Sequence, residues 1–155
     1  MEIRPCNLDD PRVIELLNTH VHRARAETAR GSAHAIDHDG LRSPDITVWT
    51  LWTGETLISI GALKRLSPDH SEIKSMHTVE SARRTGAGST LLRHLIATAK
   101  AQGAKRVSLE TGSWPYFAAA RAFYARHGFT ECAPFGDYAA DPNSVFMALD
   151  LGTCE

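Results

Sequence analysis

The sequence has few cysteines and almost no net charge, and each shortage excludes a class of protein. Its three cysteines, Cys6, Cys132 and Cys154, are scattered and odd in number, which fits neither a disulfide framework nor the ligand spacing of a zinc site. We therefore expect a reducing, cytoplasmic environment. The net charge of −1 provides no broadly basic surface of the kind that binds nucleic acids, so no nucleic-acid partner is expected.

The chain also lacks long apolar runs, repeats and linkers. No apolar run is long enough to cross a bilayer, and the first ten residues, MEIRPCNLDD, are too polar for a signal peptide, so no membrane partner is expected. Hydrophobic residues make up 43% of the 155 residues and charged residues 23%, the balance of an ordinary globular protein. Because a chain of this length typically forms one hydrophobic core, we expect a single domain over residues 1–155.

Patterns of helix and strand alternate along the chain. Apolar residues recur at helical spacing after Pro11, from Leu91 to Ala99, and from Phe117 to Tyr124. Apolar and alternating stretches predict strands from residue 3 and at residues 46–53, 57–66, 71–79, 106–111, 129–135 and 145–151. The meander before the second helix implies antiparallel pairing, and the strands separated by helices after it imply parallel pairing. The sequence therefore predicts an α/β (α+β) fold in which helices cover both faces of a mixed sheet.

Local signals indicate where the elements begin and end. Asn7 or Asp9 is expected to cap the first helix, and Pro11 suits its first turn. Gly103 and Gly128 are expected to end the later helices. The segment 30–44, which is polar and rich in histidine and aspartate, is expected to be a loop with a short helix.

Two arginines and two glycines stand directly before the second helical pattern, as Arg83-Arg84-Thr85-Gly86-Ala87-Gly88. Unpaired N–H groups and the helix dipole bind phosphate readily at the start of a helix, and glycines let a ligand approach the backbone. The arginines could add charge-assisted contacts. A solvated glycine-rich turn is the alternative, and the loop alone does not decide between them. Known nucleotide loops fit poorly, because the Gly-Lys-Ser/Thr of a P-loop is absent and Leu91 replaces the third glycine of a dinucleotide fingerprint.

The loop resembles the acyl-CoA loop of the GNAT superfamily of N-acetyltransferases, whose signature is Arg/Gln-x-x-Gly-x-Gly/Ala between the fourth strand and the third helix. The phrase FYARHGF, residues 123–129, is similar to the family's aromatic-Tyr-x-x-x-Gly-Phe motif, and EIKSMHTV, residues 72–79, stands where the family has its splayed strand. The order of elements matches over nearly the whole chain, and the tail PFGDYAADPNSVFM resembles a bacterial branch of acetyltransferases. The resemblance implies a single GNAT domain whose mostly antiparallel sheet of about seven strands splays between strands 4 and 5.

The same resemblance implies acetyl-CoA as cosubstrate, no metal, and a cofactor site along the fourth strand and the glycine loop. Backbone groups at the end of that strand would pair with the pantetheine arm, and the N–H of Met76 or His77 would stabilise the negative charge on the thioester oxygen. Backbone amides from Arg84 to Ser89 would hold the diphosphate. The residues expected to bind the cofactor are Met76, His77, Thr78, Arg83, Arg84, Thr85, Gly86, Ala87, Gly88, Ser89, Ser113 and Phe117.

Acetylation of an amine also needs a base and an acid. Freeing the lone pair of a lysine-like amine at pH 7 costs roughly 4 to 5 kcal/mol, and a nearby carboxylate can take its proton. Glu72 stands where some family members have a catalytic glutamate and is the expected base, with Glu110 and His77 in reserve; the alternative is a surface glutamate or one paired with Lys74. Tyr124 occupies the family's general-acid position and would protonate the departing thiolate, although packing on the sheet is its alternative.

The acceptor is the part of the reaction that the sequence determines least. His34, Asp37, Glu110 and Trp114 are expected to contact it, and the acidic residues indicate a cationic acceptor. His20 and His22 are two apart and would point in different directions on a helix, so a shared metal is not expected. We expect an acetyl-CoA-dependent N-acetyltransferase that acts on the primary amine of a small molecule by direct attack in a ternary complex. The alternatives are a protein or peptide N-acetyltransferase and a non-catalytic CoA-binding sensor, and a homodimer is one option for the assembly.

Overall fold

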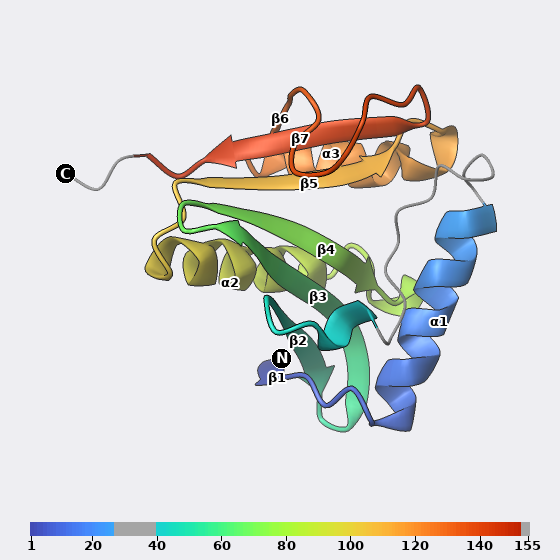
Figure 1. Cartoon of the computed structure of the whole chain (residues 1–155). Coiled ribbons are helices and arrows are strands. Elements are labelled where there is room, and N and C mark those ends of the chain that lie inside the picture. Colours follow the sequence, from blue (N-terminus) through green and yellow to red (C-terminus); the bar gives the residue numbers. More distant parts are fainter. Residues whose placement is uncertain (27–39, 153–155) are drawn as a thin grey trace.

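The computed structural model describes residues 1–26 and 40–152 and places a single sheet between helices (Figure 1). The elements, in chain order, are β1 (Glu2–Pro5), α1 (Pro11–Ala26), β2 (Ile46–Thr53), β3 (Thr56–Ser67), β4 (His70–Thr78), α2 (Ala87–Ala101), β5 (Arg106–Gly112), α3 (Ala118–Arg126), β6 (Thr130–Glu131) and β7 (Ser144–Asp150). Short 3-10 turns occur at Gly40–Arg42, Glu80–Ala82 and Pro115–Phe117. Most of the segment 30–44, with the expected acceptor residues His34 and Asp37, lies outside the described residues.

The sheet has seven strands in the order β1-β2-β3-β4-β5-β7-β6. Every neighbouring pair is antiparallel except β4 and β5, which are parallel. The parallel pair is short, because its register runs only from His70 opposite Arg106 to Glu72 opposite Ser108. Both strands continue beyond that point without pairing to each other, so the sheet splays between β4 and β5. The predicted fold class, with its mixed and mostly antiparallel sheet, is confirmed.

Helices cover both faces of the sheet because their apolar residues lie on one side of each helix. On the face that we call the α1 face, Val13 and Leu17 of α1 pack with Val48 and Ile60 of the sheet. On the opposite face, the α2–α3 face, the core contains residues of both helices and of four strands: Leu63, Ile73, Leu92, Leu95, Ala99, Val107, Leu109, Tyr124 and Met147. Figure 1 shows α1 on one side of the sheet and α2 with α3 on the other.

The α1 face carries the charged residues of the central strands. Lys74 pairs across the ladder with Ala62, which belongs to the core under α1. Cross-strand partners share a face, and residues two apart in a strand share one too. Glu72 therefore lies on the α1 face with Lys74, and so does Glu110, two residues after the Ser108 that pairs with Glu72. Across residues 1–26 and 40–152, no helix combines the length and the apolar character that a bilayer span requires.

The cap of α1 differs from the expectation. The backbone N–H of Arg12 donates to Asp10 Oδ1 at 2.9 Å, so Asp10 is the cap, whereas Asn7 accepts from the N–H of Asp9 in the preceding turn. The physical reason is Pro11, which is the first helical residue and makes the residue before it the capping position.

The strand expected at residues 129–135 is shorter than predicted. Only Thr130–Glu131 forms β6, although the N–H of Cys132 still donates to the carbonyl of Phe146 at 2.8 Å. Pro134 has no N–H with which to continue the ladder. Residues 132–143 therefore form a long connection to β7, which we call the β6–β7 loop and which carries Tyr138. The helical pattern from Phe117 to Tyr124 corresponds to α3, and a 3-10 turn at Pro115–Phe117 precedes that helix.

Candidate active site

A cleft of about 660 Å³ opens where β4 and β5 diverge. Its lining comes from the ends of both strands, the start of α2, one side of α3, and single residues of α1 and the β6–β7 loop. Since β4 and β5 carry core residues on one face and charged residues on the other, the cleft connects the two faces of the sheet. Twelve of the predicted site residues line it: Glu72, Met76, His77, Thr78, Arg83, Arg84, Gly86, Gly88, Ser89, Glu110, Phe117 and Tyr124.

The glycine loop turns sharply into α2 at one end of the cleft. Gly86 is the residue before the helix and has a φ of +87°, and Arg84 also adopts a positive φ, of +66°. The loop is held by its threonines, because Thr85 Oγ1 donates to the carbonyl of Ala82 and Thr90 Oγ1 donates to that of Gly86. The first amides of α2 have no partner within the helix. Backbone donors and the exposed side chains of Arg83 and Arg84 therefore meet at this end of the cleft.

Gly88 lets α2 lie close to its neighbours at the same end. A Cβ atom at this position would be 3.3 Å from Thr78 Oγ1 and 3.4 Å from the ring of Phe123. Most Cβ atoms in proteins keep a longer distance from their neighbours. The first turn of α2 is hydrogen-bonded to the end of α3, because Ser89 Oγ lies 2.9 Å from His127 Nε2. An anion at the N-terminus of α2 would thus contact backbone N–H groups and be flanked by β4 and α3. This arrangement fits the diphosphate implied by the resemblance.

An irregularity in β4 redirects its side chains beside the cleft. In the β3–β4 ladder, Ala62 pairs with Lys74 and Ile60 pairs with His77, so β4 has one residue more than β3 between the two pairs. Ser75 lies in this interval with a φ of +54°, and the arrangement is a β-bulge. The extra residue reverses the alternation of side chains, so that His77 lies on the α1 face together with Lys74.

His77 contacts a histidine of α1. The Nδ1 atoms of His20 and His77 are 3.3 Å apart, and the ring centroids are 5.1 Å apart. Burial lowers the pKa of His20 to about 4, and burial together with the nearby His20, Arg83 and Arg23 lowers the pKa of His77 to about 4. Both rings are therefore neutral at pH 7, and the pair joins α1 to the end of β4.

Glu72, Lys74 and Tyr138 form a buried polar cluster on the α1 face of the cleft. Lys74 Nζ lies 3.1 Å from Glu72 Oε2 and 2.8 Å from Tyr138 Oη, and the phenol donates to the same Glu72 oxygen at 2.6 Å. Only 4% of the Glu72 side chain and 9% of the Lys74 side chain are exposed. Pairing is what allows both charges to be buried. Burial, and then the Glu72 carboxylate, raise the pKa of Tyr138, so the phenol keeps its proton.

Glu110 stands on the other side of the splay with a different electrostatic environment. Burial raises the pKa of Glu110 to about 7; the nearby Ser144 and then Lys74 partly oppose this, while Glu72 and Asp141 add to it. Two carboxyl groups of one cleft thus differ in their surroundings, since Glu72 is ion-paired and Glu110 is desolvated. A carboxyl group with a pKa near the working pH is suited to accept a proton from a substrate.

Tyr124 and Phe117 lie on the α2–α3 face of the cleft. Tyr124 is buried, burial raises its pKa, and its hydroxyl has no hydrogen bond to any residue of the described part of the chain. The ring of Phe117 lies against Gly112, where a Cβ atom would be 2.1 Å from the ring. Arg121 links α3 to the end of β5 by donating to the carbonyl of Gly112 at 2.6 Å.

This architecture matches a known family. A model of the Acetyltransferase (GNAT) family matches residues 13–129 of the chain. The protein belongs to the GNAT acetyltransferase family. It is 44% identical to the uncharacterized N-acetyltransferase YsnE of Bacillus subtilis, over 97% of this chain and 100% of that protein, and 41% identical to the uncharacterized N-acetyltransferase YedL of Escherichia coli, over 99% and 95%.

The fold is also that of solved GNAT relatives. A Klebsiella pneumoniae structure assigned to the acyl-CoA N-acyltransferases superimposes with a TM-score of 0.79, at 25% identity and with 97% of each chain covered. The predicted family and the predicted enzyme class, an acetyltransferase, are confirmed by these comparisons.

Four of the residues expected in the GNAT site do not line the cleft. Thr85 and Ala87 hold the loop and the core instead, and Ser113 and Trp114 bond to the β6–β7 loop. Ser113 Oγ donates to the carbonyl of Pro142, and Trp114 Nε1 donates to an oxygen of Asn143. Among residues that sequence reasoning did not assign to the site, Lys74, Tyr138 and His20 line the cleft. Only the acidic and aromatic content of the tail could have pointed to Tyr138.

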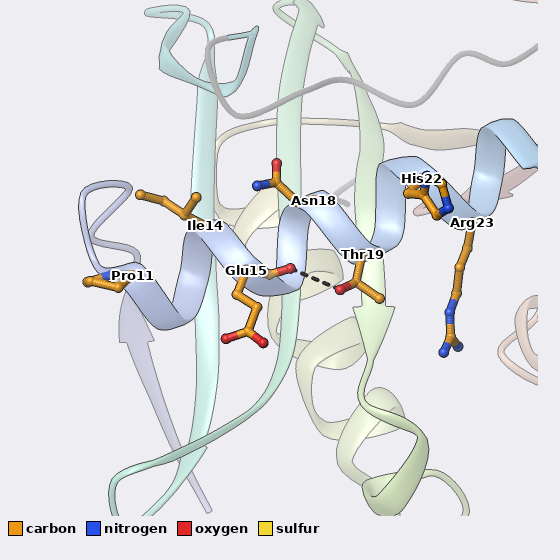
Figure 2. Close-up of a pocket in the computed structure, with 7 residues that line it drawn as sticks. All are labelled: Pro11, Ile14, Glu15, Asn18, Thr19, His22 and Arg23. Atoms are coloured by element: carbon orange, nitrogen blue, oxygen red, sulfur yellow. Dashed lines mark hydrogen bonds between the residues drawn. The ribbon is translucent and has the colours of Figure 1, made fainter.

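A second hollow runs along the outer side of α1 in this GNAT domain. Figure 2 shows its lining, which belongs to that one helix: Pro11, Ile14, Glu15, Asn18, Thr19, His22 and Arg23. The one hydrogen bond drawn there joins Thr19 Oγ1 to the carbonyl of Glu15 and is internal to the helix. The cleft at the splay, where buried titratable groups with shifted pKa values gather, is the candidate active site.

Proposed function

We propose that the protein is an N-acetyltransferase that transfers the acetyl group of acetyl-CoA to the primary amine of a small molecule. The observation that supports this most directly is the continuity of the cleft from the first turn of α2 to Glu110. A nucleotide diphosphate would lie at the α2 amides, and the attached arm would follow β4 toward the splay. The acyl group would then meet the acceptor on the α1 face.

The base in this proposal is Glu110. Its carboxyl group has a raised pKa and lines the cleft, whereas the Glu72 carboxylate is already occupied by Lys74 and Tyr138. Glu72 as the base stays a prediction, and the pH dependence of the two variants described in the Discussion separates the two assignments. His77, the other reserve, has its pKa lowered to about 4 by burial and by the charges near it, which leaves a weak base at pH 7.

The remaining groups act on the thioester. The bulge at Ser75 interrupts the ladder beside Met76, which supports the backbone N–H of Met76 as a donor to the thioester oxygen; the N–H of His77 in this role stays a prediction. Tyr124 lines the cleft, its hydroxyl has no hydrogen-bond partner among residues 1–26 and 40–152, and it would protonate the leaving thiolate.

The reaction balances as a direct transfer. The acceptor nitrogen attacks the carbonyl carbon of the thioester, a C–N bond forms and the C–S bond breaks. The acceptor ammonium first loses one proton to solvent through Glu110, which frees the lone pair for attack. After the attack, the nitrogen gives a second proton to Glu110, the thiolate takes a proton from Tyr124, and Tyr124 recovers one from Glu110 through solvent. The products are the acetamide and free CoA, and no acyl-enzyme is required. At the acceptor end of the cleft, which holds Glu72, Lys74, Glu110 and Tyr138, the charged side chains of Glu72 and Lys74 are buried, which favours a small amine over a protein chain.

Thiol release with acetyl-CoA tests the function. The purified protein is offered amino acids, polyamines, aminoglycosides and short peptides, and free thiol is measured with a chromogenic disulfide. Turnover of at least one free small amine is expected, with activity on peptides no greater. Binding of acetyl-CoA without thiol release from any amine would instead identify a sensor, and turnover of peptides alone would identify a peptide acetyltransferase. Sedimentation of the same preparation measures whether it forms a homodimer, the option left open by the sequence, and fractionation of cells tests the expected cytoplasmic location.

A further inference from the structure

Lys74 is a buried cation at the wall of the acceptor end of the cleft. Its ammonium has three N–H groups, and two of them are directed at Glu72 and Tyr138. No other described residue accepts from it, so the third N–H is available to a molecule in the cleft. A lysine that is nine-tenths buried beside an open cleft therefore has one donor for which the described chain supplies no acceptor.

Tyr138 and Glu72 hold this ammonium in place. The phenol accepts from Lys74 and donates to Glu72, and its ring packs edge-on against Phe135, with centroids 5.2 Å apart. Lys74 Nζ also lies 5.4 Å from the centre of the Tyr138 ring. With two bonds fixed by rigid partners, the direction of the third N–H is set before any acceptor arrives, which favours recognition of a defined group.

Lys74 and Glu110 lie on opposite sides of the splay. They are two residues beyond the paired positions Glu72 and Ser108, on strands that would be about 4.8 Å apart if they stayed paired and that diverge here. A donor with positive charge and a proton-accepting carboxyl group thus line the same cleft from its two strands. An acceptor with a carboxylate close to its amine matches both sides of this cleft.

We propose that Lys74 binds a carboxylate of the acceptor, so that the substrates of this site are amino carboxylic acids whose amine faces Glu110. This inference rests on the proposed function and names its substrate class. Polyamines and aminoglycosides fit this pair of groups less well, because a second ammonium would be placed beside Lys74. Tyr138 is a positioning residue in this arrangement, since it acts on the acceptor through Lys74.

Matched acceptors test the inference on the unchanged protein. Alanine, leucine and phenylalanine are each compared with the corresponding primary amide by thiol release from acetyl-CoA at pH 8. The amide has the less basic amine and is intrinsically the easier to acetylate, so a preference for the acid must come from recognition of the carboxylate. We expect kcat/KM for the best acid to exceed that of its amide at least 10-fold. Equal values, or a preference for the amides, would overturn the inference and leave the proposed function standing.

Variants then locate the preference. Lys74→Met is expected to bring the acid-to-amide ratio of kcat/KM close to 1, and Tyr138→Phe to lower it by a smaller factor. Lys64→Met is the matched control, because Lys64 lies opposite Glu72 on β3 but does not line the cleft, and it should leave the ratio as it was. The ratio is independent of how much folded protein a variant yields. A ratio unchanged in Lys74→Met would overturn the role of Lys74, whereas no thiol from any acid or amine would overturn the proposed function itself.

Discussion

The two ends of the cleft differ in the groups that form their surfaces: backbone at one end and side chains at the other. At the α2 end, the surface is mostly backbone: a left-handed Gly86, a Gly88 without a side chain, and the unpaired amides of a helix terminus. At the acceptor end, on the α1 face, the surface is made of charged and phenolic side chains from β4, β5 and the β6–β7 loop. The first end depends on local backbone conformation, and the second depends on contacts between residues far apart in the sequence.

This difference indicates which substitutions should impair each end of the cleft. Backbone geometry at the α2 end should tolerate side-chain changes that keep the turn, but it should respond to any residue that resists a positive φ. The acceptor end should respond to the loss of single polar groups, because Glu72, Lys74 and Tyr138 are bonded to one another and Glu110 lines the same cleft. The following experiments would break this contrast or sharpen it.

The largest effect is expected from Glu110→Gln. Loss of a general base lowers kcat by about 10²- to 10³-fold at pH 8. Because the pKa of Glu110 is raised to about 7, kcat of the unchanged protein should rise as the pH increases through 7 and then level off, and the variant should lose this step. The measurement is kcat from pH 5.5 to 9 with saturating acetyl-CoA. If Glu72→Gln loses the step and Glu110→Gln keeps it, Glu72 is the base.

A large loss of stability is expected from Glu72→Ala. The change leaves Lys74 buried without its carboxylate, and breaking a buried ion pair from one side costs about 3 kcal/mol. Urea denaturation followed by circular dichroism measures the free energy of unfolding. Glu131→Ala, at an exposed position of β6, is the matched control and should change it by less than about 0.5 kcal/mol. A loss as small as that of the control would show that the cluster does not stabilise the fold.

A smaller effect on turnover is expected from Tyr124→Phe. Removing the hydroxyl should lower kcat about 10-fold, because water can replace the acid in part, and KM for acetyl-CoA should stay nearly the same. The ring keeps its place in the core. Tyr116→Phe, at the exposed mouth of the cleft, serves as the control. Normal turnover in the Tyr124 variant would remove this residue from the mechanism.

The smallest effect is expected from alanine substitutions at two glycines. Gly86 and Gly54 both have a positive φ, of +87° and +59°, and neither would place a Cβ within 4 Å of another group, so alanine at either position is strained by about 1 kcal/mol without a clash. Both variants should lose similar stability in urea. Only Gly86→Ala is expected to raise KM for acetyl-CoA, by a few fold, because Gly54 lies in the β2–β3 turn. Equal KM values would show that the glycine loop does not hold the cosubstrate.

The parts of the site that could be predicted are those encoded by neighbouring residues. The glycine loop, the strand before it and Tyr124 follow from short patterns, and the site residues predicted from them line the cleft except Thr85 and Ala87. The cap of α1 was assigned to the wrong residue because three of the four residues before Pro11, namely Asn7, Asp9 and Asp10, can each accept a backbone N–H. The bulge at Ser75 was missed because nothing in the composition of β4 marks a residue with a positive φ.

The sequence by itself determined the order of elements, the family and the α2 end of the cleft, since helix and strand periods and a glycine turn are local properties of the chain. Only the tertiary structure decided the acceptor end. Lys74 and Tyr138 are 64 residues apart, and they meet because β4 and β5 pair briefly and then diverge, which leaves a gap that the β6–β7 loop reaches. Burial at that gap is what separates the two carboxyl groups electrostatically, and burial is a property of the fold and not of any single segment.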